Sequence, residues 1–150
     1  MKLKSVLLRS GYTKIKLKKI NTNHFELKAI LNGVKGRFIL DTGASSSCVA
    51  IELAEKFHLK VEDSDTKAAG AGAVGMETKM ASSNEISIKG WNYKNFDIVL
   101  FDLTHVNTAL IEHHAKAVDG IIGADILEKG KAIIDYDKHC LFLKTLVYKY

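Results

Sequence analysis

Two strand-like runs joined by Asn32-Gly33 constrain the fold of this chain more than any other feature. Residues 23–40, NHFELKAILNGVKGRFIL, carry strand-like runs on both sides of that dipeptide. Asn and Gly both tolerate positive φ angles, so Asn-Gly between two such runs predicts a two-residue β-hairpin turn. The starting expectation is therefore a fold built from hairpins.

The other periodic segments are short, and most of them also predict strands. Runs bounded by turn residues predict two strands around Gly90, a short apolar strand and a final hairpin, at 84–103, 118–123 and 131–144. Helical spacing predicts short helices at 48–59 and 124–130, and a helix or helical loop at 105–115. Many short strands without strand–helix alternation predict a mostly β domain, either a barrel or a sandwich.

Size and composition fit one ordinary globular domain. The chain has 150 residues, of which 47% are apolar and 26% charged. Its two cysteines, Cys48 and Cys140, are too few for a disulfide framework or a zinc site, so we expect free thiols. Adjacent His113 and His114 would point about 100° apart on a helix, and no other residue completes a ligand set. We expect no metal and no cofactor.

Positive charge is concentrated near the N-terminus. Residues 1–37 hold ten Lys or Arg and one acid, a formal charge of +9 in a chain of net charge +5. Such a segment can bind nucleic acid or a membrane surface, but its lysines alternate with Ile15 and Leu17, which is typical of a solvated strand face. No apolar run approaches the ~18 residues of a membrane span, and "VLL" is shorter than the roughly 7–15 of a signal peptide. We expect a cytoplasmic protein that binds neither nucleic acid nor membrane.

The segment FILDTGASSSC, residues 38–48, places a charge where a charge is costly. Asp41 ends an apolar strand, and an isolated carboxylate there would lose its hydration. Backbone N–H groups of Gly43 and Ala44 could stabilise it in a tight turn, and the Thr42 hydroxyl could fix that turn. A helix cap is the alternative, but Asp41 precedes the predicted helix by several residues and the serines at 45–47 are better placed.

A glycine-rich stretch at 70–75 reads GAGAVG. It matches the spacing of a dinucleotide-binding loop, but a polar segment precedes it and a strand-like segment follows, whereas that site requires a buried strand and then a helix. The tip of a mobile hairpin that closes over a bound peptide fits better, because glycine lets a backbone lie close to a ligand. The simpler alternative is a floppy surface loop. The residues concerned are Gly70, Ala71, Gly72, Ala73, Val74 and Gly75.

The motif ILDTGAS resembles the catalytic signature of aspartic proteases. A short chain with one copy of it resembles the retropepsin-like branch, which includes retroviral proteases and their bacterial relatives. The glycine-rich stretch follows Asp41 by about thirty residues, where that family carries its flap. GIIG at 120–123 and ADIL at 124–127 resemble the segment beside the catalytic loop and the short helix after it. The resemblance covers roughly residues 23–144.

This resemblance implies a retropepsin-like closed β-barrel, the acid-protease fold with one lobe per chain and short helices. Residues 1–22 would be a basic N-terminal segment packed on or preceding the barrel, 23–144 the protease domain, and 145–150 a tail and candidate dimer contact. The terminal strand around 141–150 or the N-terminal segment would complete the dimer.

The implied activity is that of a homodimeric aspartic endopeptidase acting on peptides or proteins. A symmetric dimer would place Asp41 against Asp41 of the second copy, with Thr42 bonding across the axis. The implied catalytic residues are Asp41, Thr42 and Gly43, and the implied substrate contacts are the flap and Ala44, Ser45, Ile122 and Gly123. The alternatives are a dimeric peptide-binding module without turnover and a nucleic-acid-binding protein using the basic segment.

Two positions depart from the family pattern. Ala44 replaces the serine that would donate a hydrogen bond to the aspartates, so we expect the pair to hold its proton to higher pH than strongly acid enzymes do. Retroviral enzymes carry an arginine after the glycine of the downstream segment, whereas here Ala124 and Asp125 follow Gly123. We expect Asp125 to cap the helix at 124–129.

Overall fold

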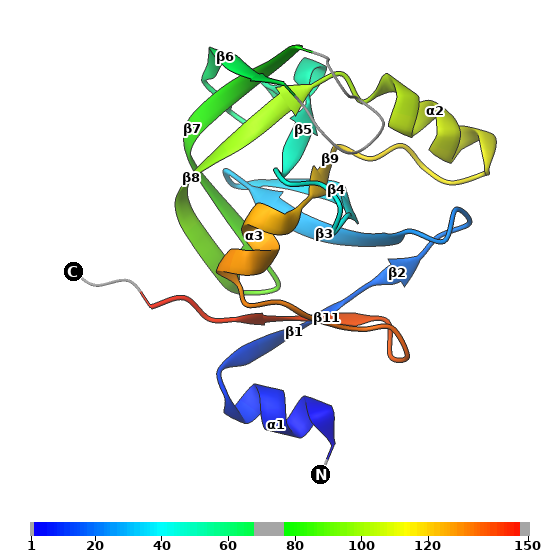
Figure 1. Ribbon diagram of the computed structural model, residues 1–150, viewed down its shortest axis with the longest axis vertical. Helices are drawn as coiled ribbons and strands as arrows, with labels where there is room; N and C mark the ends of the chain where they lie inside the picture. Colours follow the sequence, from blue (N-terminus) through cyan, green and yellow to red (C-terminus); the bar gives the residue numbers. More distant parts are fainter. Residues whose placement is uncertain (1, 68–76, 148–150) are drawn as a thin grey trace.

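The computed structural model describes residues 2–67 and 77–147, which form a β-barrel with a small sheet and three α-helices around it (Figure 1). The larger sheet has eight strands in the order β2-β3-β4-β9-β5-β8-β7-β6, and pairing of β3 with β7 closes six of them into a ring. The strands of this sheet are β2 (Lys18–Lys19), β3 (Phe25–Leu31), β4 (Val34–Leu40), β5 (Cys48–Ala50), β6 (Val61–Lys67), β7 (Glu77–Ile88), β8 (Trp91–Phe101) and β9 (Gly120–Ile122). The predicted closed barrel is confirmed.

The hairpin predicted at Asn32-Gly33 joins β3 to β4. Both turn residues have positive φ, 49° and 83°. The Asn32 side chain also ties the turn to the rest of the barrel, since its amide donates to the carbonyl of Phe57 and its oxygen accepts from the N–H of Glu85. Asparagine therefore supplies both the turn geometry and a cross-barrel link.

A second sheet packs beside the barrel and uses both ends of the chain (Figure 1). Its order is β1-β11-β10, formed by β1 (Tyr12–Lys16), β10 (Ile133–Asp135) and β11 (Cys140–Lys144). Ile15 and Leu17 are buried in the main core, as their alternation with lysines predicted. Helix α1 (Leu3–Arg9) precedes this sheet.

Strand β11 is the middle strand of that small sheet. It pairs with β1 on one side and β10 on the other, and the Lys144 carbonyl accepts from the Trp91 indole N–H. Cys140–Phe142 pairs with a strand on each side, so a second copy cannot add to an edge of β11 there. The dimer contact that we expect from the terminal segment stays a prediction.

The helix predicted at 48–59 is wrong over most of its length, since residues 54–58 form turns. Cys48–Ala50 forms β5, which inserts between β8 and β9 inside the barrel, and only Ile51–Leu53 forms a short 3-10 helix (η1). Val49 and Phe57 are both fully buried. The helical spacing of the apolar residues in this segment therefore reflects their burial and not a continuous helix. Strand pairing with two neighbours outweighed local helical preference.

Two further helices lie on the barrel, α2 (Thr104–Glu112) between β8 and β9 and α3 (Ala124–Lys129) after β9. Both are at positions where the sequence allowed a helix. In the part of the chain that the structure describes, no helix is long and apolar enough to cross a membrane.

Candidate active site

The Asp41 loop is held between two strands that both pair with β9. Strand β4 runs parallel to β9 and ends at Leu40, while β5 runs antiparallel to β9 on its other side. The N–H of Asp41 donates to the carbonyl of Ile122, which continues the β4–β9 ladder into the loop. Residues 41–47 must therefore form a compact turn over the end of β9.

Asp41 is half-buried at the start of this turn. Its Oδ1 accepts a hydrogen bond from the N–H of Gly43 at 2.9 Å, as we expected. The N–H of Ala44 donates instead to the backbone carbonyl of Asp41, at 3.2 Å, so only one backbone donor reaches the carboxylate. Thr42 and Gly43 are exposed, and Ala44 is buried. One carboxylate oxygen is thus fixed and the other is free of such a bond within the described residues.

Two glycines let β9 pass close beneath the loop. A Cβ atom on Gly120 would lie 2.2 Å from the carbonyl oxygen of Cys48, and one on Gly123 would lie 2.6 Å from that of Ala44. Both contacts are with backbone, which cannot rotate away. The structure places Gly123 against the loop, and the substrate contact that we expect from it stays a prediction.

Asp125 lies in the first turn of α3, where its Oδ1 accepts from the N–H of Ile126 at 2.8 Å, and it also anchors the far end of the loop. Its carboxylate accepts from the N–H of Ser47 at 2.9 and 3.0 Å and from the Ser47 hydroxyl at 2.6 Å. The Ser47 oxygen in turn accepts from the N–H of Gly123 at 2.8 Å. Ser47 is fully buried, so these bonds satisfy every polar group it brings into the core. The helix begins at Gly123 without a side-chain cap.

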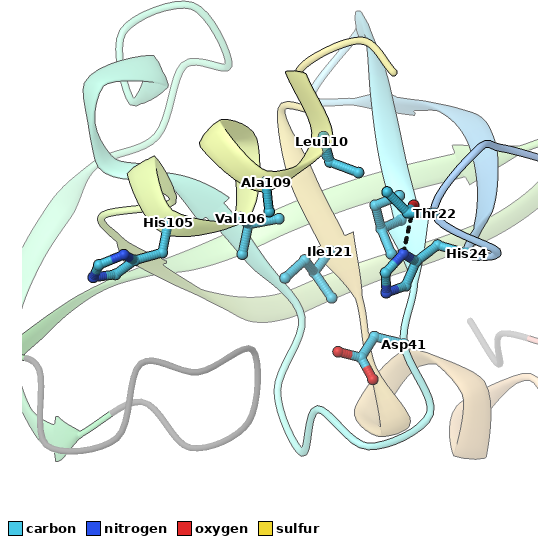
Figure 2. A pocket seen from close by; sticks show the side chains of 9 residues that line it. Thr22, His24, Asp41, His105, Val106, Ala109, Leu110 and Ile121 are labelled. Carbon is cyan, nitrogen blue, oxygen red and sulfur yellow. Dashed lines mark hydrogen bonds between the residues drawn. The ribbon is translucent and has the colours of Figure 1, made fainter. Parts of the chain in front are cut away.

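A cavity of about 270 Å³ opens beside the Asp41 carboxylate (Figure 2). Ile39 of β4 and Ile121 of β9 lie on its barrel side, and α2 contributes His105, Val106, Ala109 and Leu110. Ile122, an expected substrate contact, is buried in the core and does not line this cavity, whereas alternation along the strand turns its neighbour Ile121 to it. The remaining lining residues, Thr22 and His24, come from the turn before β3.

Several residues of this site carry no signal in the sequence. Nothing in the sequence signals that the 20–24 turn or α2 would reach Asp41, because both are brought there by strand order. Ala44 and Ser45, the other expected substrate contacts, do not line this cavity. The stretch 70–75 lies outside the described residues; β6 and β7 flank it, and the strand that follows contradicts a dinucleotide-binding loop, which needs a helix there.

Other candidate groups have structural roles. Asp102 accepts from the N–H of Thr104 at the start of α2, Asp119 from the N–H of Arg37, and Asp135 from the N–H of Lys138. Burial raises the pKa of the Cys48 thiol to about 12, and the nearby carboxylates add to that effect, so this cysteine stays protonated and is no nucleophile. Within residues 2–67 and 77–147, no three His, Cys, Asp or Glu residues gather as a metal site would require.

A family model described as "Aspartyl protease" matches residues 27–126, two thirds of the chain and the whole Asp41 loop with β9. The chain belongs to the aspartyl protease family. No curated protein matches it significantly. Among solved structures, a retropepsin-like aspartic protease from Rickettsia conorii is 25% identical, with 88% of this chain and 91% of that chain covered and a TM-score of 0.62.

Two more distant structures share the fold. EIAV protease, solved in complex with the inhibitor HBY-793, is 20% identical with a TM-score of 0.55, covering 73% of this chain and 90% of that one. The retroviral protease-like domain of Ddi1 from Leishmania major is 18% identical with a TM-score of 0.50, covering 81% and 93%. This aspartyl protease family member therefore has the retropepsin-like fold that its sequence resembled.

Proposed function

We propose that the protein is a homodimeric aspartic endopeptidase in which Asp41 of each subunit contributes one carboxyl group. The observation that carries the proposal is a single half-buried Asp41 at the rim of a cavity, in a chain with one copy of the motif. One carboxyl group cannot both activate water and protonate its target. The exposed Thr42 and Gly43 form the face on which a second copy would complete the pair.

Two carboxyl groups about 3 Å apart share one proton, because both cannot ionise cheaply. The ionised member takes a proton from a bound water while the protonated member hydrogen-bonds to the scissile carbonyl oxygen. Water attacks that carbonyl carbon, and the tetrahedral diol collapses as the leaving amine gains a proton. The Gly43 N–H fixes Oδ1 of each Asp41, which positions the other oxygen for this exchange. The peptide lies extended in the cavity, and the flap at 70–75 would close over it.

The proposed dimer would use C-terminal backbone that is not already paired within the small sheet. Cys140–Phe142 is paired on both sides and Lys144 also donates to the Gly130 carbonyl, so the tail after Lys144 is the C-terminal candidate. Val147 is 89% exposed, so its apolar side chain is available for a contact with a second copy. Of the basic residues in β1 and β2, Lys14 is half-buried and Lys16, Lys18 and Lys19 are exposed.

Mixing subunits tests the shared site directly. If each site needs two intact Asp41 residues, a ninefold excess of Asp41→Asn subunits reduces cleavage per wild-type subunit to roughly a tenth after exchange, because most wild-type subunits then sit in mixed dimers. Activity would be measured with a fluorogenic peptide, alongside molecular mass by light scattering. An equal excess of Lys4→Gln subunits, which keep Asp41, is the control. Unchanged activity per wild-type subunit would mean that one chain suffices.

Ala44→Ser tests how the loop sets the proton balance. A hydroxyl at this position donates to the ionised aspartate pair, stabilises the ionised form and lowers its apparent pKa. The acid limb of kcat/KM should move to lower pH by about half to one unit, as one hydrogen bond of about 1 kcal/mol predicts. A pH profile of both proteins measures this. A shift to higher pH, or a wild-type enzyme active only below about pH 3, would contradict the role of Ala44.

A further inference from the structure

One end of the cavity beside Asp41 carries an imidazole. Figure 2 shows His24 above Asp41 at this end and His105 at the opposite end, with Val106, Ala109 and Ile121 between them. The middle of the cavity is apolar. His24 and the Asp41 carboxylate therefore lie on the same side of the cavity (Figure 2).

His24 is held in place by a tight turn. The N–H of Ile20 donates to the His24 carbonyl at 3.0 Å, and the N–H of Asn23 donates to the Ile20 carbonyl at 2.9 Å. Asn23 has a φ of 67°, a conformation that asparagine tolerates better than most residues. The Asn21 amide donates to the His113 carbonyl at the end of α2, which joins this turn to the opposite wall of the cavity. The imidazole is thus presented from a fixed backbone.

Thr22 orients the ring. Its Oγ1 lies 2.7 Å from Nδ1 of His24, within hydrogen-bond distance (Figure 2). With the hydroxyl as donor, Nδ1 is the acceptor and the ring carries its proton on Nε2. A protonated imidazole carries a hydrogen on both nitrogens, so Nε2 is a donor there as well. In this tautomer, and in the imidazolium, His24 offers an N–H donor at the cavity rim, whose partner would be an acceptor on the substrate.

The adjoining face of the sheet adds a positive charge. Register places Lys18, Glu26, Ile39 and Ile121 in one row across β2, β3, β4 and β9, on the face that lines the cavity. Glu26 is neutralised by Arg37, whose Nε lies 2.9 Å from its carboxylate. Lys18 is exposed and has no ion pair within the described residues. Lys18 lies two strand spacings, about 10 Å, from Ile39 of the cavity wall. A substrate that extends past the cavity on this side would come close to Lys18.

We propose that His24 and Lys18 are specificity-determining residues that select an acidic side chain of the peptide on the β2 side of the cleavage site. The His24 Nε2–H donates to the carboxylate, and Lys18 attracts it electrostatically. The apolar walls receive the neighbouring side chain. Without these two groups, the negative charge of the Asp41 pair would repel an acidic substrate. This inference rests on the proposed protease activity and adds the class of peptide that the site accepts.

The test compares glutamate with glutamine, which differ in charge but hardly in shape. Octapeptide mixtures are made in pairs, with Glu or Gln fixed at one of the eight positions and the other positions randomised. Cleavage by the wild-type dimer gives a Glu/Gln ratio of kcat/KM for each position, at low salt. The same ratio is measured as equilibrium binding to the Asp41→Asn dimer, so that recognition is read even without turnover.

We expect the wild-type enzyme to prefer Glu over Gln at one position or at adjacent positions. His24→Leu and Lys18→Gln should each lower the Glu/Gln ratio of kcat/KM about two- to fivefold. Thr22→Val should lower it too, since it frees the ring that Thr22 orients. Lys4→Gln removes the same charge from α1 and should leave the ratio as in wild type. The preference should weaken with added salt.

A Glu/Gln ratio at or below one at every position overturns the inference, as does a preference that survives His24→Leu and Lys18→Gln. Absence of binding by either mixture overturns it as well. Failure of the proposed function would look different: no Asp41-dependent cleavage, with the binding ratios still deciding whether His24 and Lys18 select acidic peptides.

Discussion

Asp41→Asn should abolish peptide cleavage while leaving the fold and peptide binding intact. An amide cannot take a proton from water or return one to the leaving amine, so both acid and base are lost at once. General acid–base catalysis supplies about 10²–10⁴ of the rate, and we expect kcat to fall at least about 10³-fold. The substitution is nearly isosteric, and an Asn carbonyl can still accept from the Gly43 N–H that Oδ1 accepts from now. Unfolding free energy should therefore change by less than about 1 kcal/mol.

The measurement combines cleavage with binding. Wild type and Asp41→Asn are compared on a peptide library by mass spectrometry and on a labelled peptide by anisotropy, and Asp137→Asn, at a side chain 87% exposed, is the control. Wild type that binds peptides but never cleaves them would favour the alternative, a dimeric peptide-binding module. Cleavage that persists in Asp41→Asn would place the chemistry elsewhere.

Most of the strands could be predicted from the sequence because the signals for them are local. Asn32-Gly33, the strands around Gly90 and the final hairpin each depend on a turn and the few residues beside it, and such signals are read within a short window. The match to the aspartyl protease family model confirms the family that the Asp41 motif indicated. Strand Cys48–Ala50 was missed because its identity depends on two partners distant in sequence, β8 and β9.

The site was predictable only where it coincides with a motif. Asp41 stands out because a charge ends an apolar strand. His24 and α2 do not stand out, since neither has a pattern of its own, and the strand order that brings them to the cavity is not visible in a single sequence. The bond between Asp125 and Ser47 was missed for the same reason: the two residues are 78 positions apart, and local sequence suggested only a role within the helix.

Asp125→Ala should be among the most destabilising single substitutions in this protein that remove only polar groups. It leaves the buried N–H of Ser47 without its acceptor and removes the partner that orients the Ser47 hydroxyl toward Gly123. A buried donor left unpaired costs about 1–3 kcal/mol, and hydrogen bonds to a charged group are the stronger ones. We expect a loss of about 2–4 kcal/mol of unfolding free energy, measured by urea denaturation.

A graded series separates this role from simple loss of charge. Asp125→Asn keeps one acceptor and should cost about half as much, whereas Asp137→Ala, at a side chain 87% exposed, should be near neutral. Because Ser47 closes the loop that begins at Asp41, Asp125→Ala should also lower kcat in the fraction that remains folded. Equal stability of Asp125→Ala and Asp137→Ala would show that the loop is held by the β4–β9–β5 ladder alone, without the carboxylate.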